Sequence, residues 1–251
     1  MKELEAYSPK SIAGKRILVT GGTTGIGRAT ARLLAGLGAK VFITGRNIEP
    51  LMQALSDTRE MYPDADIDGV ISDLSGKEQI DHLFEEFDKK YGDLDILINN
   101  AGLAAESVTQ GNYDQWQYIV HTNLLHYMAC ANKAAKKMSG KSGHIVNIGS
   151  MSAEVAEANS SVYVATKAGI RGFSASLRKE LNPKGIRVTL IEPGAVSTDM
   201  QPGGSEEHQE KIDAMEMLEA EDIAAAVIFC LSMPGRCDIA LLQPKPTKQI
   251  I

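Results

Sequence analysis

The sequence predicts one α/β domain over residues 1–251, in which a doubly wound, parallel seven-stranded sheet carries helices on both faces. Two observations support this fold class. Apolar runs of strand length recur along the chain, and they are nearly continuous rather than alternating, as expected for strands that are buried on both faces. Stretches of helical length separate these runs to the end of the chain, and no change of composition marks a second domain.

The elements are predicted in order from these alternating runs. Six apolar runs are clear strands, and a seventh near the end of the chain is weaker. The longer stretches between them are helices, and a glycine-rich polar segment is a loop. The predicted strands are 16–21, 40–45, 67–73, 94–100, 143–150, 186–194 and 238–242, the predicted helices are 26–37, 49–61, 77–91, 113–138, 154–181 and 207–233, and the loop is 201–209.

Composition and charge exclude several classes of function. Apolar residues make up 43% of the chain and charged residues 23%, which is ordinary for a globular protein. The net charge is −6 and no basic cluster occurs, so binding to nucleic acid or to an anionic membrane is not expected. The first ten residues lack the apolar core of a secretory signal, and the apolar run 223–231 is too short to span a bilayer. We therefore expect a cytoplasmic protein.

The cysteines and histidines give no sign of a disulfide or a metal site. Cys130, Cys230 and Cys237 are odd in number and show no CxxC spacing, so we expect reduced thiols. His121 and His126 are five residues apart and would not share one face of an α-helix. No metal is therefore predicted.

A glycine-rich turn follows the first predicted strand. The sequence TGGTTGIG, residues 20–27, places Gly21, Gly25 and Gly27 between a strand and the start of a helix. Glycines allow a tight turn there and let backbone N–H groups approach a pyrophosphate at the helix N-terminus. The GK[ST] sequence of a phosphate-binding Walker loop is absent. The alternative is an ordinary strand-to-helix turn with no ligand.

Polar and glycine residues follow three later strands as well. NNAG (99–102) ends the fourth strand, Ser150 ends the fifth, and PG (193–194) with Thr198 follows the sixth. Ligands of open α/β sheets bind beyond the carboxyl ends of the strands. These groups are therefore expected at one edge of the sheet, together with the glycine-rich turn.

Seven motifs occur in the order and spacing of the short-chain dehydrogenase/reductase family, which the sequence therefore resembles over roughly residues 12 to 235. They are TGGTTGIG, Asp73, NNAG, Asn123, Ser150, YVATK (163–167) and PG. It implies a Rossmann-type domain and an oxidoreductase whose catalytic residues are Asn123, Ser150, Tyr163 and Lys167. It also implies a nicotinamide cofactor held by Gly21, Thr23, Gly25, Ile26, Gly27, Arg46, Asp73, Leu74, Asn100, Ala101, Gly102, Tyr163, Lys167, Pro193, Gly194, Val196 and Thr198.

The chemistry of these residue types fits such a reaction. Tyr163 could exchange a proton with the substrate oxygen, and Lys167, one helical turn on, would stabilise the tyrosinate. Ser150 would hydrogen-bond the substrate oxygen, and the resemblance implies that Asn123 kinks its helix around a water that relays protons to Lys167. The alternatives are a surface Tyr–Lys pair, a merely buried and hydrogen-bonded Asn123, and Asp73 as a helix N-cap instead of an adenine contact.

The end of the second strand indicates which cofactor is used. An NAD site places an acidic residue there, but Gly45 occupies the expected position and Arg46 follows it. An arginine suits the 2′-phosphate of NADP through its charge and its planar set of donors. NADP(H) is therefore predicted over NAD(H), although Thr24 stands where many NADP-dependent family members have a basic residue.

The substrate is predicted to be a small alcohol or carbonyl compound. The end of the chain, residues 233–251, resembles the subgroup of the family that acts on small 3-hydroxy acids such as serine or allo-threonine, and the segment 197–217 over the site is compact. A 3-oxoacyl carrier-protein reductase and a non-catalytic NADP-binding sensor or scaffold are the alternatives. The two long helices, 113–138 and 154–181, are typical of the family's subunit interface, so a homodimer or homotetramer is expected.

Overall fold

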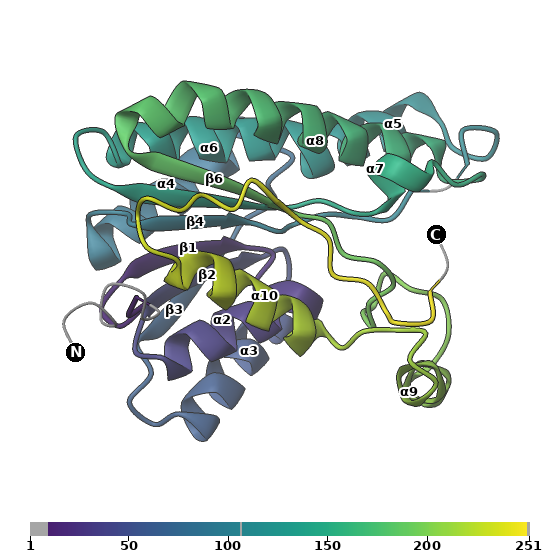
Figure 1. Ribbon diagram of the computed structural model, residues 1–251, viewed down its shortest axis with the longest axis horizontal. Helices are drawn as coiled ribbons and strands as arrows, with labels where there is room; N and C mark the ends of the chain where they lie inside the picture. Colours follow the sequence, from purple (N-terminus) through teal and green to yellow (C-terminus); the bar gives the residue numbers. More distant parts are fainter. Residues whose placement is uncertain (1–9, 106, 250–251) are drawn as a thin grey trace.

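The computed structural model of the protein describes residues 10–105 and 107–249. Its seven strands form one sheet in the order β3-β2-β1-β4-β5-β6-β7, and all neighbouring strands are parallel (Figure 1). The predicted fold class is confirmed, and β7, over the weakest apolar run, is the shortest strand. The strands are β1 (Arg16–Thr20), β2 (Lys40–Gly45), β3 (Ile67–Ile71), β4 (Ile96–Asn99), β5 (Gly143–Ile148), β6 (Ile186–Ile191) and β7 (Leu241–Leu242).

Helices cover both faces of the sheet (Figure 1). One face is covered by α2 (Gly25–Gly36), α3 (Ile48–Met61) and α10 (Ala220–Ser232). The other face is covered by α4 (Lys77–Tyr91), α6 (His126–Lys137) and α8 (Ser161–Leu181). The strand order changes direction between β1 and β4, where a doubly wound sheet opens a crevice at the carboxyl ends of its strands.

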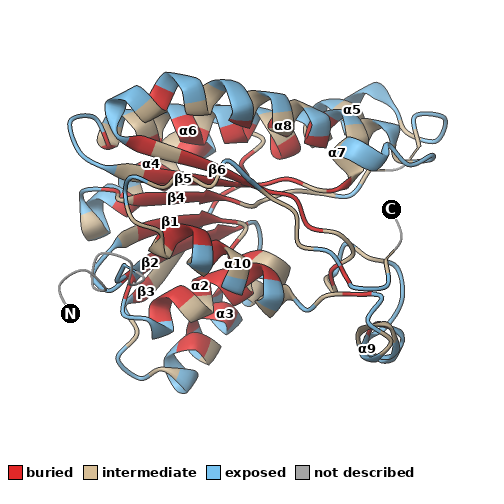
Figure 2. Ribbon diagram, viewed as in Figure 1, coloured by how far each residue is buried: buried red, intermediate tan, exposed pale blue. Residues whose placement is uncertain are grey.

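Alternate residues of each strand build two separate cores. In β1, Ile17 and Val19 belong to the core beneath α2 and α10, whereas Leu18 belongs to the core beneath α4 and α6. Figure 2 shows the buried residues concentrated in the strands and in the inner faces of the helices. The central strands are buried on both sides, which explains why their sequences are continuously apolar.

The predicted helix 113–138 exists but changes its geometry in the middle. It begins as α5 (Tyr113–Val120), passes through a π-helical turn (His121–Leu125) and continues as α6. A π turn inserts an extra residue into the helix and is common at functional sites. At the start of α5, Trp116, the only tryptophan of the chain, packs directly against Gly111.

Two other predicted helices were too long. The stretch 154–181 contains the short α7 (Ser152–Val155) and then α8, because Ala156 and Asn159 between them adopt left-handed backbone conformations. The stretch 207–233 is divided into α9 (Ser205–Asp213) and α10 by Met215, which is also left-handed. The loop predicted at 201–209 is therefore wrong from Ser205 onward.

The described residues contain no group of three or more His, Cys, Asp or Glu side chains arranged to hold a metal ion. Among the helices of this part of the chain, none is long and apolar enough to cross a bilayer. The three cysteines are not joined in disulfides.

Candidate active site

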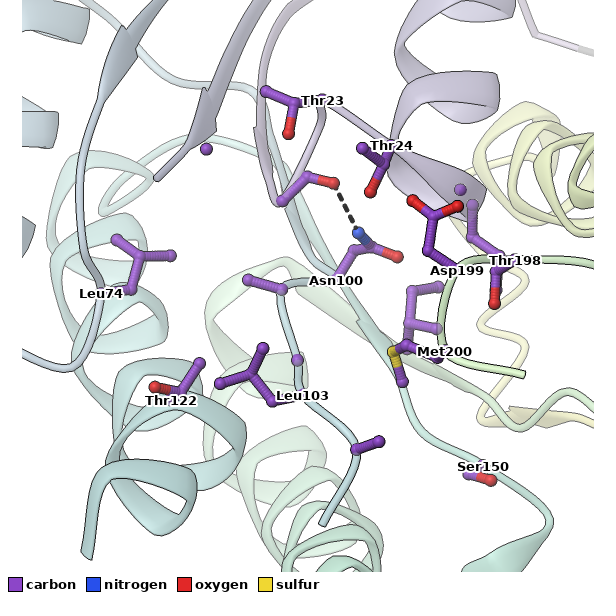
Figure 3. A pocket seen from close by; sticks show the side chains of 18 of the residues that line it. Thr23, Thr24, Leu74, Asn100, Leu103, Thr122, Ser150, Thr198, Asp199 and Met200 are labelled. Carbon is purple, nitrogen blue, oxygen red and sulfur yellow. Dashed lines mark hydrogen bonds between the residues drawn. The ribbon is translucent and has the colours of Figure 1, made fainter. Parts of the chain in front are cut away.

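A cavity of about 850 Å³ lies beyond the carboxyl ends of the strands. Its wall contains the turn after β1 and the segments that follow β2, β4, β5 and β6, so the predicted grouping at one edge of the sheet is found (Figure 3). Of the described residues that line it, Arg46, Lys167 and Asp199 carry charge. Three predicted site residues do not line this cavity: Asn123, Asp73 and Gly27. All the other predicted site residues belong to its wall.

The turn after β1 is built on glycines that approach other backbone closely. Gly21 is left-handed, with φ of 63°, and a Cβ atom there would lie 2.8 Å from Ala101 Cα. A Cβ atom on Gly27 would collide with the carbonyl oxygen of Gly21. These contacts require glycine at both positions and leave the N-terminus of α2 uncovered toward the cavity.

The end of β4 fixes the shape of this turn. Asn100 Nδ2 donates to the carbonyl oxygens of Thr20 (3.1 Å) and Gly21 (3.0 Å), the second of which is visible in Figure 3. Thr20 Oγ1 in return accepts hydrogen bonds from the N–H groups of Asn100 and Ala101. Asn100 therefore acts on the glycine-rich turn, and the adjacent Ala101 and Gly102 line the cavity.

At the far end of the cavity, which lies beside the end of β2, three polar side chains are linked by hydrogen bonds. Arg46 Nη1 donates to Tyr118 Oη (2.9 Å), and Tyr118 Oη donates to Asp73 Oδ2 (2.9 Å). Asp73 Oδ1 accepts from the N–H of Ser75. Burial opposes ionisation of Asp73, but the hydrogen bonds from Ser75 and Tyr118 outweigh it and keep the pKa below its usual value. The N-cap of α4 is Gly76, so the alternative role of Asp73 as an N-cap is wrong.

Lys167 is deeply buried beside Tyr163. Its exposed fraction is 3%, its Nζ donates to Ile148 O (3.2 Å), and it lies 5.5 Å from the centre of the Tyr163 ring. Burial lowers the pKa of Lys167 to about 8, and the charge of Glu192 acts in the opposite direction. The alternative interpretation as a solvated surface pair is therefore wrong for these two residues, because Lys167 is buried.

Tyr163 itself is held in its neutral form. Burial raises the pKa of Tyr163, a hydrogen bond with Ser150 acts against this rise, and the charge of Glu157 adds to it. The sequence predicted that Lys167 would favour the tyrosinate, and this stays a prediction, since burial is the largest influence on the pKa of Tyr163. The lysine alone does not overcome the cost of burying a tyrosinate.

Ser150 begins a hydrogen-bonded path along one wall. Its Oγ donates to Ser152 Oγ (3.1 Å), and Ser152 Oγ donates to Glu157 Oε1 (2.5 Å). These residues, with Tyr163, line a second cavity of about 430 Å³ that adjoins the first. The sequence analysis did not single out Glu157. The signal that could have found it is its position, as a charged residue between the Ser150 and Tyr163 motifs.

Asn123 lies within the π-helical turn and is fully buried. Its Oδ1 accepts from Leu103 N and its Nδ2 donates to Leu103 O, both at 2.8 Å. The side chain thus holds the segment after β4 against the helix. The predicted helix distortion is present, and so is the alternative of a buried, hydrogen-bonded amide.

The segment after β6 closes the cavity from the side of the chain's last residues. Pro193, Gly194, Val196 and Thr198 line the cavity as predicted. Gly194 N donates to Pro244 O, and Ala195 N donates to Gln249 Oε1. Gln249 also lines the smaller cavity. The sequence did not indicate this role, because Gln249 lies far from every motif along the chain.

Comparisons with known proteins agree with this geometry. Residues 15–209 match the sequence profile of the family described as short chain dehydrogenase. The chain is 35% identical over 219 residues to carbonyl reductase family member 4 of Danio rerio, covering 86% of this chain and 91% of that protein.

Two solved structures are similar over almost the whole chain. One is a short chain dehydrogenase from Burkholderia cenocepacia in complex with NADP, with a TM-score of 0.83 and 29% identity over 94% of this chain and 98% of that one. The other is a variant of actinorhodin polyketide ketoreductase with NADPH, with a TM-score of 0.82, 29% identity and the same coverage. The chain belongs to the short-chain dehydrogenase/reductase family and is an oxidoreductase of that family.

Proposed function

We propose that residues 1–251 form one NAD(P)-binding domain that transfers a hydride between NADP(H) and a small alcohol or carbonyl compound. The observation that carries this proposal is the arrangement of one continuous cavity. Its far end has Arg46 and the glycine-rich turn, and its near end has Ser150, Tyr163 and Lys167. A dinucleotide placed along it would have its phosphates at the N-terminus of α2.

The residues present fit a dinucleotide. The glycines keep side chains away from the N-terminus of α2, where backbone N–H groups would hold the pyrophosphate. The other predicted contacts are Thr23, Ile26, Leu74, Asn100, Ala101 and Gly102, with Pro193, Gly194, Val196 and Thr198 on the facing loop, and Asp73 acts through Tyr118. A bound nicotinamide supplies or accepts the hydride.

Three observations support NADP over NAD. Arg46 is exposed at the end of β2, lines the cavity and stands two residues before the start of α3, whose N-terminus also favours an anion. No acidic side chain follows β2 before Glu49, and the two similar structures contain NADP or NADPH. We therefore assign the 2′-phosphate to Arg46.

The catalytic roles follow from the near end of the cavity. Tyr163 in its neutral form can donate a proton to a substrate oxygen, and Ser150 can hydrogen-bond the same oxygen. Lys167 brings a buried positive charge beside the tyrosine and favours the tyrosinate that forms when the proton leaves. The proton-relay water at Asn123 stays a prediction.

The adjoining cavity of about 430 Å³ supports a small substrate. A 3-hydroxy acid, which the tail of the sequence implies, stays a prediction, as does a cytoplasmic location. We also propose a homodimer or homotetramer. Its support is the exposed apolar side chains of Val120, Leu125 and Met128 along the helix from α5 to α6.

Replacing Tyr163 by Phe tests the catalytic assignment, because it removes only the hydroxyl. We expect nearly all turnover to be lost while the Kd for NADPH stays close to wild type, measured by nicotinamide absorbance and by calorimetry. Lys167→Ala should harm both. A Tyr163→Phe variant that keeps more than about a tenth of kcat, a loss of under ~1.4 kcal/mol, would rule out the proton-donor role.

A further inference from the structure

Among the described residues, the smaller cavity beside Ser150 and Tyr163 is lined by one charged side chain. Its described lining combines apolar residues with the hydroxyls of Ser150, Ser152, Ser160 and Tyr163 and the amides of Gln201 and Gln249. Glu157 alone adds a charge, and that charge is negative. A substrate group that enters this cavity therefore meets hydrogen-bonding groups and an anion.

Glu157 is exposed, and no cation of the described residues forms an ion pair with it. Its one hydrogen bond in the described part of the chain comes from Ser152 Oγ to Oε1, which leaves Oε2 available. The cations nearest in sequence have other partners: Arg171 pairs with Glu154 and Glu192, and Lys167 Nζ donates to Ile148 O. A positively charged donor on the substrate would satisfy this carboxylate, since charge-assisted hydrogen bonds are among the stronger ones.

The path from the reacting group to Glu157 is short. Ser150, which would hold the substrate oxygen, is separated from Glu157 by Ser152 alone. The carboxylate is thus two hydrogen bonds away from the point at which the alcohol oxygen would bind. A substrate whose oxygen binds there needs only a short spacing between that oxygen and a cation to reach Glu157, and a vicinal amino alcohol has such a spacing.

We propose that the substrate is a vicinal amino alcohol, or the corresponding α-amino carbonyl compound, and that Glu157 determines this specificity by binding its ammonium group. The inference rests on the proposed function. Oxidation converts the C–H and O–H bonds of the alcohol into a C=O bond: the hydride would pass to a bound NADP, Tyr163 in its tyrosinate form accepts the proton, and the ammonium group is unchanged. Serine-like hydroxy acids share this ammonium group, whereas plain 3-hydroxy acids do not.

Electrostatics adds support from the tyrosine. The charge of Glu157 contributes to the raised pKa of Tyr163. A cation bound to Glu157 compensates that charge, so a substrate of this class itself makes the tyrosinate easier to form. A carboxylate in the same place would meet repulsion from Glu157 and would leave the pKa of Tyr163 raised.

Three secondary alcohols of similar size test the proposal: 1-amino-2-propanol, 1,2-propanediol and 3-hydroxybutyrate. The variant is Glu157→Gln, which keeps an acceptor for Ser152 and removes the charge. Glu85→Gln, which removes an exposed charge on α4 outside the cavities, is the matched control. Because Glu157 is exposed, we expect Glu157→Gln to lower kcat/KM for the amino alcohol by about three- to fivefold, with little change for the diol.

Binding is measured separately, by titrating 1-amino-2-propanol into protein saturated with NADPH, a complex that cannot react. We expect the affinity to fall by a similar factor in Glu157→Gln and to be unchanged in Glu85→Gln. Equal affinity in wild type and Glu157→Gln, or a wild type that prefers 3-hydroxybutyrate to the amino alcohol, would overturn the proposal. Turnover of the diol with NADP in that case would leave the proposed function intact, whereas protein that binds no NADP(H) would refute the proposed function itself.

Discussion

Arg46 is held toward the cavity by its hydrogen bond to Tyr118 Oη. We expect Arg46→Ala to weaken NADP binding by roughly 10- to 150-fold, because a hydrogen bond to a charged group contributes about 1.5–3 kcal/mol. NAD, which has a hydroxyl in place of the phosphate, should change little. The measurement is the Kd for both cofactors at fixed low salt, since salt screens the charge.

The matched control is Lys40→Ala, which removes an exposed cation at the opposite end of β2. It should leave both dissociation constants unchanged. A wild-type protein that already prefers NAD would contradict the proposed NADP preference. An Arg46→Ala variant with unaltered NADP affinity would show that another group binds the phosphate.

Gly45, next to Arg46, shows why cofactor preference cannot be changed at this position alone. An acidic residue there would suit the ribose hydroxyl of NAD. However, a Cβ atom on Gly45 would lie 2.5 Å from Thr23 Cγ2, so any side chain collides with the glycine-rich turn. Gly45→Asp therefore requires a smaller residue at position 23 as well, and no feature of the sequence reveals this contact.

Helix α8 carries the proposed catalytic residues Tyr163 and Lys167 and is also an anchor. Tyr163, Lys167 and Arg171 follow one another at intervals of four residues and so share one face of the helix. Arg171 makes two hydrogen bonds to Glu192, of 2.8 and 2.6 Å, and the Glu192 side chain is fully buried directly before Pro193. This ion pair ties the helix to the loop on the other side of the cavity.

We expect Arg171→Met to lower the free energy of unfolding by about 3 kcal/mol, because it leaves Glu192 buried with only Gln243 as a donor. The double variant Arg171→Met with Glu192→Met should recover most of the loss, since no unpaired charge remains. Urea denaturation measures both.

Arg178→Met on the same helix is the control. Arg178 lies 3.7 Å from Asp238 in a pair that is partly exposed, so its loss should cost no more than about 1 kcal/mol. Equal losses for Arg171→Met and Arg178→Met would mean that the Glu192 pair is no stronger than a surface contact.

How far the sequence predicts structure also differs between elements. The first six strands were predicted to within a few residues, because in five of them nearly every residue is buried and the apolar run is unbroken, whereas the edge strand β3 is only partly buried. The breaks at Ala156 and Met215 were missed because left-handed backbone usually requires glycine, and these residues give no such signal. Asn159 gave a weak one, since asparagine adopts this conformation more readily than other side chains. Glu157 was missed with them, since it lies inside a stretch that was expected to be helical.

At the scale of the whole molecule, two buried histidines link stability to pH. Burial lowers the pKa of His126 and of His144 to about 3 each, whereas an unfolded histidine titrates near 6.5. Between these values the unfolded chain binds more protons, so the free energy of unfolding falls as the pH falls. The contribution is fully present above about pH 6.5 and is lost progressively toward pH 3.

From pH 7 to pH 5 we expect each of these histidines to remove roughly 2 kcal/mol. This window lies above the pKa of unfolded carboxylates, about 4, so acidic residues add little to the change. His126→Phe, which cannot titrate, should reduce the loss by about half in urea denaturation at the two pH values. A wild-type midpoint that does not move between pH 7 and pH 5 would contradict the assignment.

The position of Trp116 gives this protein an optical property. The chain's only tryptophan lies on α5, the helix whose Gln115, Tyr118 and Ile119 line the larger cavity. A reduced nicotinamide absorbs light in the region where tryptophan emits, so energy transfer from one indole would make occupancy of the cavity visible. Because there is a single emitter, the signal would come from one known place in the fold, without a label and without any substrate.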